Sequence, residues 1–341
     1  MSKFGILSYL NNSGIGNIAK EFRQYLNVED FFIVNFPQKP TRKDWLNGGE
    51  YFGTKPTHQT EEKEIREWFS QSKIDKLLII ETPFNWKLFD IAREFGIKVY
   101  ALIHWECFRP TKEWHKAELL ISHTKFGYEF LKKEGYKNIQ YIPYPINTKY
   151  LQFRERRKIE TLLFPCGFGG VNERKNIEAV LEAHKHINKK LIITTQKELN
   201  IDTNNIDNIE IKTGEVPEYK DIYKEGDLVL YPTKYEGLGL CILEAMACGI
   251  PVLTTNSAPM NEYIREPELL IDVARQENLI IYHTFKGNII DIKNMIKKTN
   301  ALLDKDISVL SRKMRQRIEE EFSWDAVGNQ YLKIFNFCEW R

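Results

Sequence analysis

The sequence predicts an α/β protein made of two Rossmann-like domains. Short apolar runs alternate along the chain with segments of helical spacing, the pattern of parallel strands joined by crossover helices. Glycine-rich turns follow two of the apolar runs, at residues 14–16 and 167–170. At 341 residues the chain is long for one domain and has enough apolar residues for two cores.

The first domain is expected over residues 1–150. Its apolar runs end at turn residues, and helical spacing follows most of them. Residues 37–60 are rich in Pro, Gly, Lys and aromatic residues, so we expect an irregular loop there that faces an acceptor. The expected strands are 4–10, 31–34, 77–81, 98–103, 117–122 and 139–142, and the expected helices are 17–26, 61–71, 86–95 and 124–134.

The second domain is expected over residues 151–323 and contains the most informative stretch, residues 227–256. This stretch predicts a strand at 228–231, a loop, a helix at 240–248 and a second strand that begins at Pro251. Gly237 and Gly239 let the loop backbone approach a ligand closely. The amides at the start of the helix carry roughly half a positive charge, so the loop predicts a phosphate-binding site.

Two carboxylates flank this predicted phosphate site. Glu236 lies in the loop, and Glu244 lies in a helix that is apolar nearly all round and therefore buried. A buried carboxylate costs several kcal/mol, in order of magnitude, unless something donates hydrogen bonds to it. Sugar or ribose hydroxyls would do so. The alternative is that Glu236 only favours a helix N-terminus and that Glu244 has a backbone or arginine partner.

Residues 236–253, EGLGLCILEAMACGIPVL, resemble the signature of glycosyltransferase family 4, also called glycosyl transferases group 1. This family contains retaining nucleotide-sugar enzymes with the GT-B fold, in which two Rossmann-like domains face a cleft. The resemblance implies that the backbone of Gly237, Leu238, Gly239 and Leu240 binds the donor diphosphate. It also implies that Glu236 contacts the transferring sugar and that Glu244 contacts the ribose. A C-terminal helix, residues 324–341, would then pack back on the first domain.

A second phosphate-binding segment is expected after the strand at 161–166. Glycines up to Gly170 precede the basic pair Arg174 and Lys175, which is a suitable arrangement for holding a leaving phosphate. A solvated basic turn is the alternative. The resemblance places Lys175 on the diphosphate, whereas Phe168 stands where the family has an arginine, and Arg174 is its substitute. The resemblance also places Val216 against the nucleobase.

Three residues of the first domain complete the predicted site. His104 follows a fully apolar strand, and the resemblance places it on hydroxyls of the donor sugar; a structural histidine at a loop is the alternative. Gly16 and Asn17 lie in a pattern that invites a dinucleotide-binding interpretation, but no acidic residue follows the second strand. The resemblance instead places both near the donor phosphates or the acceptor. A tight turn is the alternative for them.

The resemblance implies a retaining, hexosyltransferase-like enzyme that moves a sugar from a nucleotide-sugar donor to an acceptor hydroxyl on a glycan, a lipid or another compound. His104, Lys175 and Glu236 are the predicted catalytic residues. No cofactor and no divalent metal is expected, because no Asp-x-Asp motif ends a strand. Two alternatives are a nucleotide-sugar epimerase on the same fold and a catalytically silent protein that binds a carbohydrate or nucleotide.

The overall composition and charge limit the classes of partner that the protein is expected to bind. The net charge of +2 gives no strong signal for nucleic acid, although the mild positive excess before residue 152 would suit an anionic acceptor or a membrane surface. Five cysteines show neither metal-ligand nor paired spacing and indicate reduced thiols. Without a signal pattern or an apolar run long enough to cross a bilayer, we expect a cytoplasmic protein, at most peripheral to a membrane.

Overall fold

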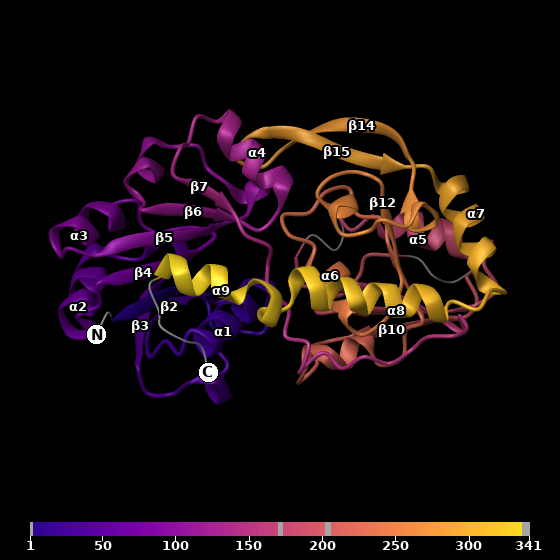
Figure 1. Ribbon diagram of the computed structural model, residues 1–341, viewed down its shortest axis with the longest axis horizontal. Coiled ribbons are helices and arrows are strands. Elements are labelled where there is room, and N and C mark those ends of the chain that lie inside the picture. Colours follow the sequence, from indigo (N-terminus) through magenta and orange to yellow (C-terminus); the bar gives the residue numbers. More distant parts are fainter. Residues whose placement is uncertain (1–2, 170–172, 202–205, 336–341) are drawn as a thin grey trace. The chain divides into compact units, whose positions relative to one another are not determined.

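The computed structural model describes residues 3–169, 173–201 and 206–335 (Figure 1). The chain divides into two compact units, of which unit 1 comprises Met1–Pro143 and Gly328–Arg341 and unit 2 comprises Tyr144–Val327. Each unit contains one parallel sheet with helices. The α/β fold with two Rossmann-like domains is therefore confirmed.

Unit 1 has a seven-stranded sheet in the order β3-β2-β1-β4-β5-β6-β7, with every pair parallel. The central strands β1 and β4 are buried along their whole length, because both faces are covered. The strands are β1 Phe4–Ser8, β2 Asp30–Asn35, β3 Glu50–Pro56, β4 Lys76–Ile80, β5 Lys98–Ile103, β6 Leu119–Ser122 and β7 Ile139–Tyr141. The α-helices are α1 Gly14–Tyr25, α2 Glu62–Ser72, α3 Leu88–Glu94 and α4 Lys125–Lys133.

The expectation of an irregular loop over residues 37–60 is wrong for its second half. Strand β3 lies at the edge of the sheet and pairs with β2, and the short helices η1 (Lys43–Trp45) and η2 (Thr57–Gln59) flank it. As an edge strand it is partly exposed along both faces and contains Gly53 and Lys55. These features remove the apolar alternation by which a strand is recognised in a sequence.

Unit 2 repeats this topology in a six-stranded parallel sheet of order β10-β9-β8-β11-β12-β13. The strand order reverses between β8 and β11, the kind of position at which α/β proteins bind ligands. The strands are β8 Thr161–Gly167, β9 Lys190–Thr195, β10 Ile209–Thr213, β11 Leu228–Tyr231, β12 Val252–Thr255 and β13 Leu270–Ile271. The α-helices are α5 Ile177–His184, α6 Leu240–Ala247, α7 Ile292–Leu303 and α8 Ser308–Arg317.

An antiparallel hairpin in unit 2 was not predicted from the sequence. It consists of β14 (Val273–Ile280) and β15 (Thr284–Ile290) and forms a long ribbon in Figure 1. Its base is attached to the loop after β11, because the backbone N–H of Asn288 donates to the carbonyl of Lys234 at 2.9 Å. The ring of Phe285 packs edge-on against Tyr235, with centroids 4.8 Å apart. The hairpin thus supports the loop that leads to Glu236.

Helix α9 (Trp324–Phe335) begins in unit 2 and ends in unit 1. Ser323 caps it by accepting a hydrogen bond from the backbone N–H of Ala326 at 3.1 Å. Trp324, Tyr331 and Phe335 are all buried, so this aromatic stripe of the helix packs inside the protein. Among the helices of the described residues, none is both long and apolar enough to cross a bilayer.

Candidate functional site

The carboxylate of Glu236 lies at the centre of a buried polar cluster in unit 2. Its Oε1 accepts hydrogen bonds from Lys175 Nζ at 2.7 Å, the Tyr231 hydroxyl at 2.8 Å and the Thr233 hydroxyl at 3.1 Å. Its Oε2 accepts from Arg174 Nη1 at 2.5 Å. The Tyr231 hydroxyl also contacts Lys175 Nζ, so the phenol bridges the lysine and the carboxylate.

The sheet topology explains why residues so distant in sequence meet here. Strands β8 and β11 are parallel neighbours, so their carboxyl ends lie at the same edge of the sheet. The segment after β8 contains Arg174 and Lys175 before it enters α5, and the segment after β11 contains Glu236 before it enters α6. The point of reversed strand order therefore contains the predicted cations and the predicted carboxylate.

The two cations keep Glu236 ionised although it is only 4% exposed. Burial would raise the pKa of Glu236, but Arg174 and Lys175 outweigh that effect and lower the pKa from 4.5 to about 2. The stabilisation that these pairs give is therefore fully present above about pH 4.5 and is lost as the pH falls through about 2. Two cations against one carboxylate leave the cluster with a net charge of +1, which favours an anionic ligand.

The glycine loop leads directly from this cluster into α6. Gly239 precedes the helix with a φ of +81°, a left-handed conformation that favours glycine. Leu238 is buried, and the Tyr263 hydroxyl donates to its carbonyl at 2.7 Å, which fixes the loop. The backbone N–H groups from Gly237 to Leu240 are thus in the segment that begins the helix, where an anion is favoured.

Glu244 is buried in α6, as expected, and one of its partners inside the protein is a tyrosine. The hydroxyl of Tyr223, from the short helix η5 (Tyr219–Tyr223), donates to its Oε2 at 2.6 Å. Tyr223 is itself fully buried, and burial, followed by the nearby Cys241 and Glu244, raises the pKa of its phenol well above 10. The tyrosine therefore stays protonated and donates to the carboxylate.

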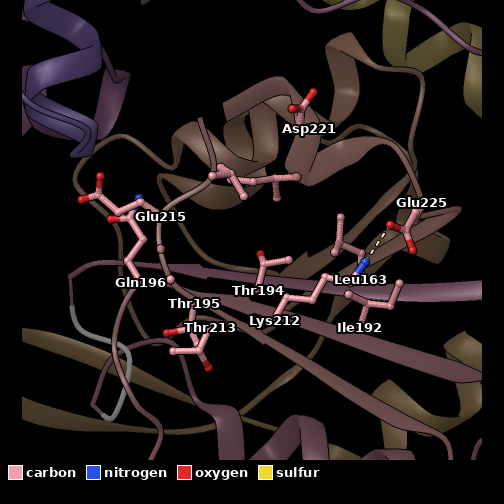
Figure 2. A pocket seen from close by; sticks show the side chains of 14 residues that line it. Leu163, Ile192, Thr194, Thr195, Gln196, Lys212, Thr213, Glu215, Asp221 and Glu225 are labelled. Atoms are coloured by element: carbon pink, nitrogen blue, oxygen red, sulfur yellow. Dashed lines mark hydrogen bonds and ion pairs between the residues drawn. The ribbon is translucent and has the colours of Figure 1, made fainter. Parts of the chain in front are cut away.

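A cavity of about 120 Å³ opens beside β9 and β10 in the same unit. Figure 2 shows Gln196 and Glu215 close together at one side of it, and Lys212 joined to Glu225 at the other. Lys212 Nζ lies 2.6 Å from Glu225 Oε1. Val216, the residue expected against a nucleobase, lines this cavity.

Gly16 occupies the first turn of α1 and not a loop, which corrects the expectation of a glycine loop at residues 14–16. The hydroxyl of Ser13 caps the helix by accepting from Gly16 N–H at 3.2 Å, and the N–H of Asn17 donates to the Ser13 carbonyl at 2.8 Å. A Cβ at Gly16 would lie 1.9 Å from the Asn11 carbonyl oxygen. The glycine therefore permits close packing of the helix on the segment before it.

Gly16→Ala is expected to destabilise the protein by about 1–3 kcal/mol without any ligand, because the added methyl group would clash with backbone that cannot rotate away. Urea denaturation measures the change in the free energy of unfolding. The matched control is Gln24→Ala on the exposed face of the same helix, for which we expect less than about 0.5 kcal/mol. Equal stabilities of Gly16→Ala and wild type would contradict the packing role.

His104 lies at the end of β5 in unit 1, only 6% exposed. Its Nδ1 lies 3.4 Å from Glu81 Oε1, and its ring centroid lies 6.4 Å from that of His123. His104, Gly16 and Asn17 belong to unit 1, and the other described members of the predicted site belong to unit 2. The structure brings Arg174, Lys175 and Glu236 into direct contact, and Gly170 lies outside the described residues.

Four residues of these clusters escaped the sequence analysis: Tyr231, Thr233, Tyr223 and Glu81. Tyr231 and Thr233 flank a predicted strand end and could have been found by their proximity to Glu236. Tyr223 contacts Glu244 from 21 residues away, in a segment without a motif. Glu81 has no sequence signal except its position directly after a buried strand.

Part of the chain is similar in sequence to known glycosyltransferases. Residues 160–281 match the family model of glycosyl transferases group 1. A probable sucrose-phosphate synthase of Thermosipho melanesiensis is 28% identical over 200 residues, which cover 58% of this chain and 38% of that protein. The chain thus matches less than half the length of this relative.

Solved structures of glycosyltransferases share the fold over nearly the whole chain. The sucrose-phosphate synthase of Thermosynechococcus elongatus has a TM-score of 0.70 at 14% identity, with 98% of each chain covered. HepE of Anabaena, in complex with UDP and glucose, has a TM-score of 0.73 at 12% identity, with 98% of this chain and 100% of that chain covered. Residues 160–281 are thus similar to glycosyl transferases group 1, and the chain as a whole has the GT-B fold of these solved structures.

Proposed function

We propose that the protein is a retaining glycosyltransferase that moves a sugar from a nucleotide-sugar donor to an acceptor hydroxyl. The observation that supports this most strongly is the cluster in which Arg174 and Lys175 converge on Glu236 at the start of α6. This cluster lies within the matched family segment and combines cations, helix amides and a carboxylate in one place. A nucleoside diphosphate and the sugar attached to it need these groups.

When the donor binds, Glu236, Arg174 and Lys175 exchange their contacts with one another for contacts with the donor. The diphosphate brings negative charge to Arg174 and Lys175, and the backbone amides from Gly237 to Leu240 donate to its oxygens. The carboxylate of Glu236 then accepts hydrogen bonds from hydroxyls of the sugar in place of those from the cations. The ribose hydroxyls bind Glu244, and the base enters the cavity beside Val216.

Transfer breaks the bond between the anomeric carbon and the diphosphate oxygen, and the electron pair leaves with the diphosphate. Arg174, Lys175 and the helix amides stabilise this charge as it develops. The acceptor oxygen attacks on the face that the diphosphate leaves, so the anomeric configuration is retained, and its proton passes to a phosphate oxygen. His104 contacts hydroxyls of the donor sugar, and Gly16 and Asn17 lie near the phosphates or acceptor.

A screen of nucleotide sugars, scored by released nucleoside diphosphate, tests this function. A glycosyltransferase releases diphosphate from its donor in the presence of an acceptor, which can be a glycan, a lipid or another hydroxyl compound. Product analysis then identifies the acceptor and shows whether the anomeric configuration is retained. An isomeric nucleotide sugar formed without any acceptor would instead identify an epimerase, and binding without turnover of any donor would identify a silent binding protein.

Glu244→Ala is expected to weaken binding of the bare nucleoside diphosphate by about 10- to 100-fold, because hydrogen bonds from the ribose to a charged acceptor are lost. Isothermal titration calorimetry measures the affinity. Tyr223→Phe is the matched control, since it removes the internal hydrogen bond but keeps the carboxylate. Equal affinities of Glu244→Ala and wild type would show that Glu244 does not bind the ribose.

We further propose that transfer requires no divalent metal, because Arg174, Lys175 and the helix amides already neutralise the diphosphate. The rate of transfer is expected to be unchanged in excess chelator. A rate that falls in chelator and recovers with manganese or magnesium would show that a metal shares this role.

A further inference from the structure

Glu81 lies at the point of unit 1 that corresponds to the cluster of unit 2. It is the first residue after β4, and β4 is the parallel neighbour of β1 at which the strand order reverses. In an open α/β sheet, ligands bind outside the carboxyl ends of the strands at such a position. Its carboxylate lies 3.4 Å from Nδ1 of His104, at the end of the next strand β5.

The backbone of Glu81 adopts an unfavourable conformation. Its φ of +73° is left-handed, a region that residues with a Cβ rarely occupy unless the surrounding structure imposes it. The fold does impose it, because the Glu81 N–H donates to the carbonyl of Leu102 on β5 at 2.8 Å. Glycine or asparagine would fit this position with less strain. The glutamate therefore contributes something other than local stability.

Its side chain restricts where the proton of His104 can lie. An ionised carboxylate only accepts hydrogen bonds, so its contact with His104 requires the proton on Nδ1. When the ring is neutral, its lone pair then lies on Nε2. The separation of 3.4 Å is long for a hydrogen bond, and such contacts in unliganded sites often shorten when the substrate binds.

Two further histidines lie near this pair. The ring centroid of His123 lies 6.4 Å from that of His104, and burial, followed by His104 itself, lowers the pKa of His123 to about 3, so His123 is neutral. Burial, followed by Arg109, also lowers the pKa of His58, while Glu81 opposes this change. Arg109 Nη2 lies 3.2 Å from His58 Nε2, which fits a neutral histidine as the acceptor. The Glu81 carboxylate thus contacts His104 and also acts on the pKa of His58.

We propose that Glu81 is a positioning residue that holds His104 in the Nδ1–H tautomer, so that Nε2 accepts a hydrogen bond from a hydroxyl of the donor sugar. This inference rests on the proposed function for its effect on transfer, but the tautomer of His104 can be measured without any activity. The strained backbone at position 81 is maintained because it directs the carboxylate to His104.

Nitrogen NMR of protein labelled with ¹⁵N-histidine tests the tautomer directly, with His104→Gln to assign the signals. In the wild type we expect the proton of His104 on Nδ1. In Glu81→Gly we expect it to move largely to Nε2, whereas Glu81→Gln keeps an acceptor oxygen and should keep the proton on Nδ1. An unchanged tautomer in Glu81→Gly would overturn the proposal.

Measurements of kcat, KM and Tm distinguish a positioning role of Glu81 from a purely structural role. Glu81→Gly is expected to lower kcat at least tenfold, with KM for the donor within about threefold, while its Tm equals or exceeds that of the wild type. Lys73→Gly is the matched control, because it also replaces a left-handed residue, at φ +51°, on an exposed helix end; it should leave kcat unchanged. Glu81→Gln should retain most of the wild-type kcat.

The outcomes are distinguishable. A kcat of Glu81→Gly within twofold of wild type would overturn the positioning role. If both kcat and Tm of Glu81→Gly fell, Glu81 would have a structural role in folding and not a positioning role. Should Glu81→Gly not fold, Glu81→Asn takes its place, since asparagine tolerates the left-handed region. If no donor is turned over by the wild type, the proposed function fails, and the NMR result still decides whether Glu81 sets the tautomer of His104.

Discussion

Glu236→Ala is expected to destabilise the unliganded protein by about 3–5 kcal/mol and to lower kcat by about 10³-fold. The loss of stability follows from burial, since Lys175 is only 4% exposed and would lose the carboxylate that neutralises it. The loss of turnover follows from the proposed contact between Glu236 and the transferring sugar. Urea denaturation and initial rates at saturating donor measure the two effects.

A nucleoside diphosphate should partly reverse the instability of Glu236→Ala, because its phosphates supply negative charge to Arg174 and Lys175. We therefore expect the ligand to raise the Tm of this variant by more than it raises that of the wild type. Glu182→Ala, on an exposed face of α5, is the control. It should change neither the stability of the unliganded protein nor the rise in Tm that the ligand causes. A Glu236→Ala protein as stable as the wild type would refute the account of the buried ion pair.

Lys175→Ala is expected to lower kcat by about 10²- to 10³-fold, because the ammonium group stabilises the charge that develops on the leaving diphosphate. The effect on stability should be smaller than for Glu236→Ala, since Arg174 remains 2.5 Å from the carboxylate. Single-turnover kinetics separate transfer from product release. The same measurement on Arg174→Ala tests whether Arg174 replaces the arginine that the family has near the glycines.

A different kinetic result for Lys175→Ala would give the lysine another role. If Lys175→Ala lowered only the affinity for the donor and left the single-turnover rate unchanged, Lys175 would bind the ground state and not the transition state. The guanidinium of Arg174 lies 3.8 Å from the position of a Cβ on Gly169, so it lies close to the glycine that follows β8. This placement supports Arg174 as the substitute.

The sequence was sufficient to predict the strands that lie in the middle of each sheet. Strands β5 and β11 have the predicted bounds, because fully buried parallel strands are continuous apolar runs between turn residues. The edge strand β3 and the hairpin of β14 and β15 were missed for the opposite reason. Strands β3 and β14 consist of half-buried and exposed residues, and the hairpin tip includes the exposed Ile280 and Tyr282, which do not indicate a core.

The members of the predicted site that the structure brings into contact all follow strand ends. Arg174, Lys175 and Glu236 could be placed at one edge because their strands carry motifs. The partners inside the protein could not be predicted, because a tyrosine such as Tyr223 reaches Glu244 through tertiary packing that leaves no periodic signal. Glu81 could not be predicted either, since only the coordinates show its left-handed backbone.

A crystal structure of the protein with a nucleoside diphosphate tests the central claim most directly. We predict that the diphosphate lies against the backbone amides from Gly237 to Leu240, with Lys175 Nζ and the Arg174 guanidinium on its oxygens. The base should fill the cavity beside Val216, and the ribose hydroxyls should contact Glu244. A nucleotide bound elsewhere, with Glu236 still holding both cations, would contradict the proposed donor site.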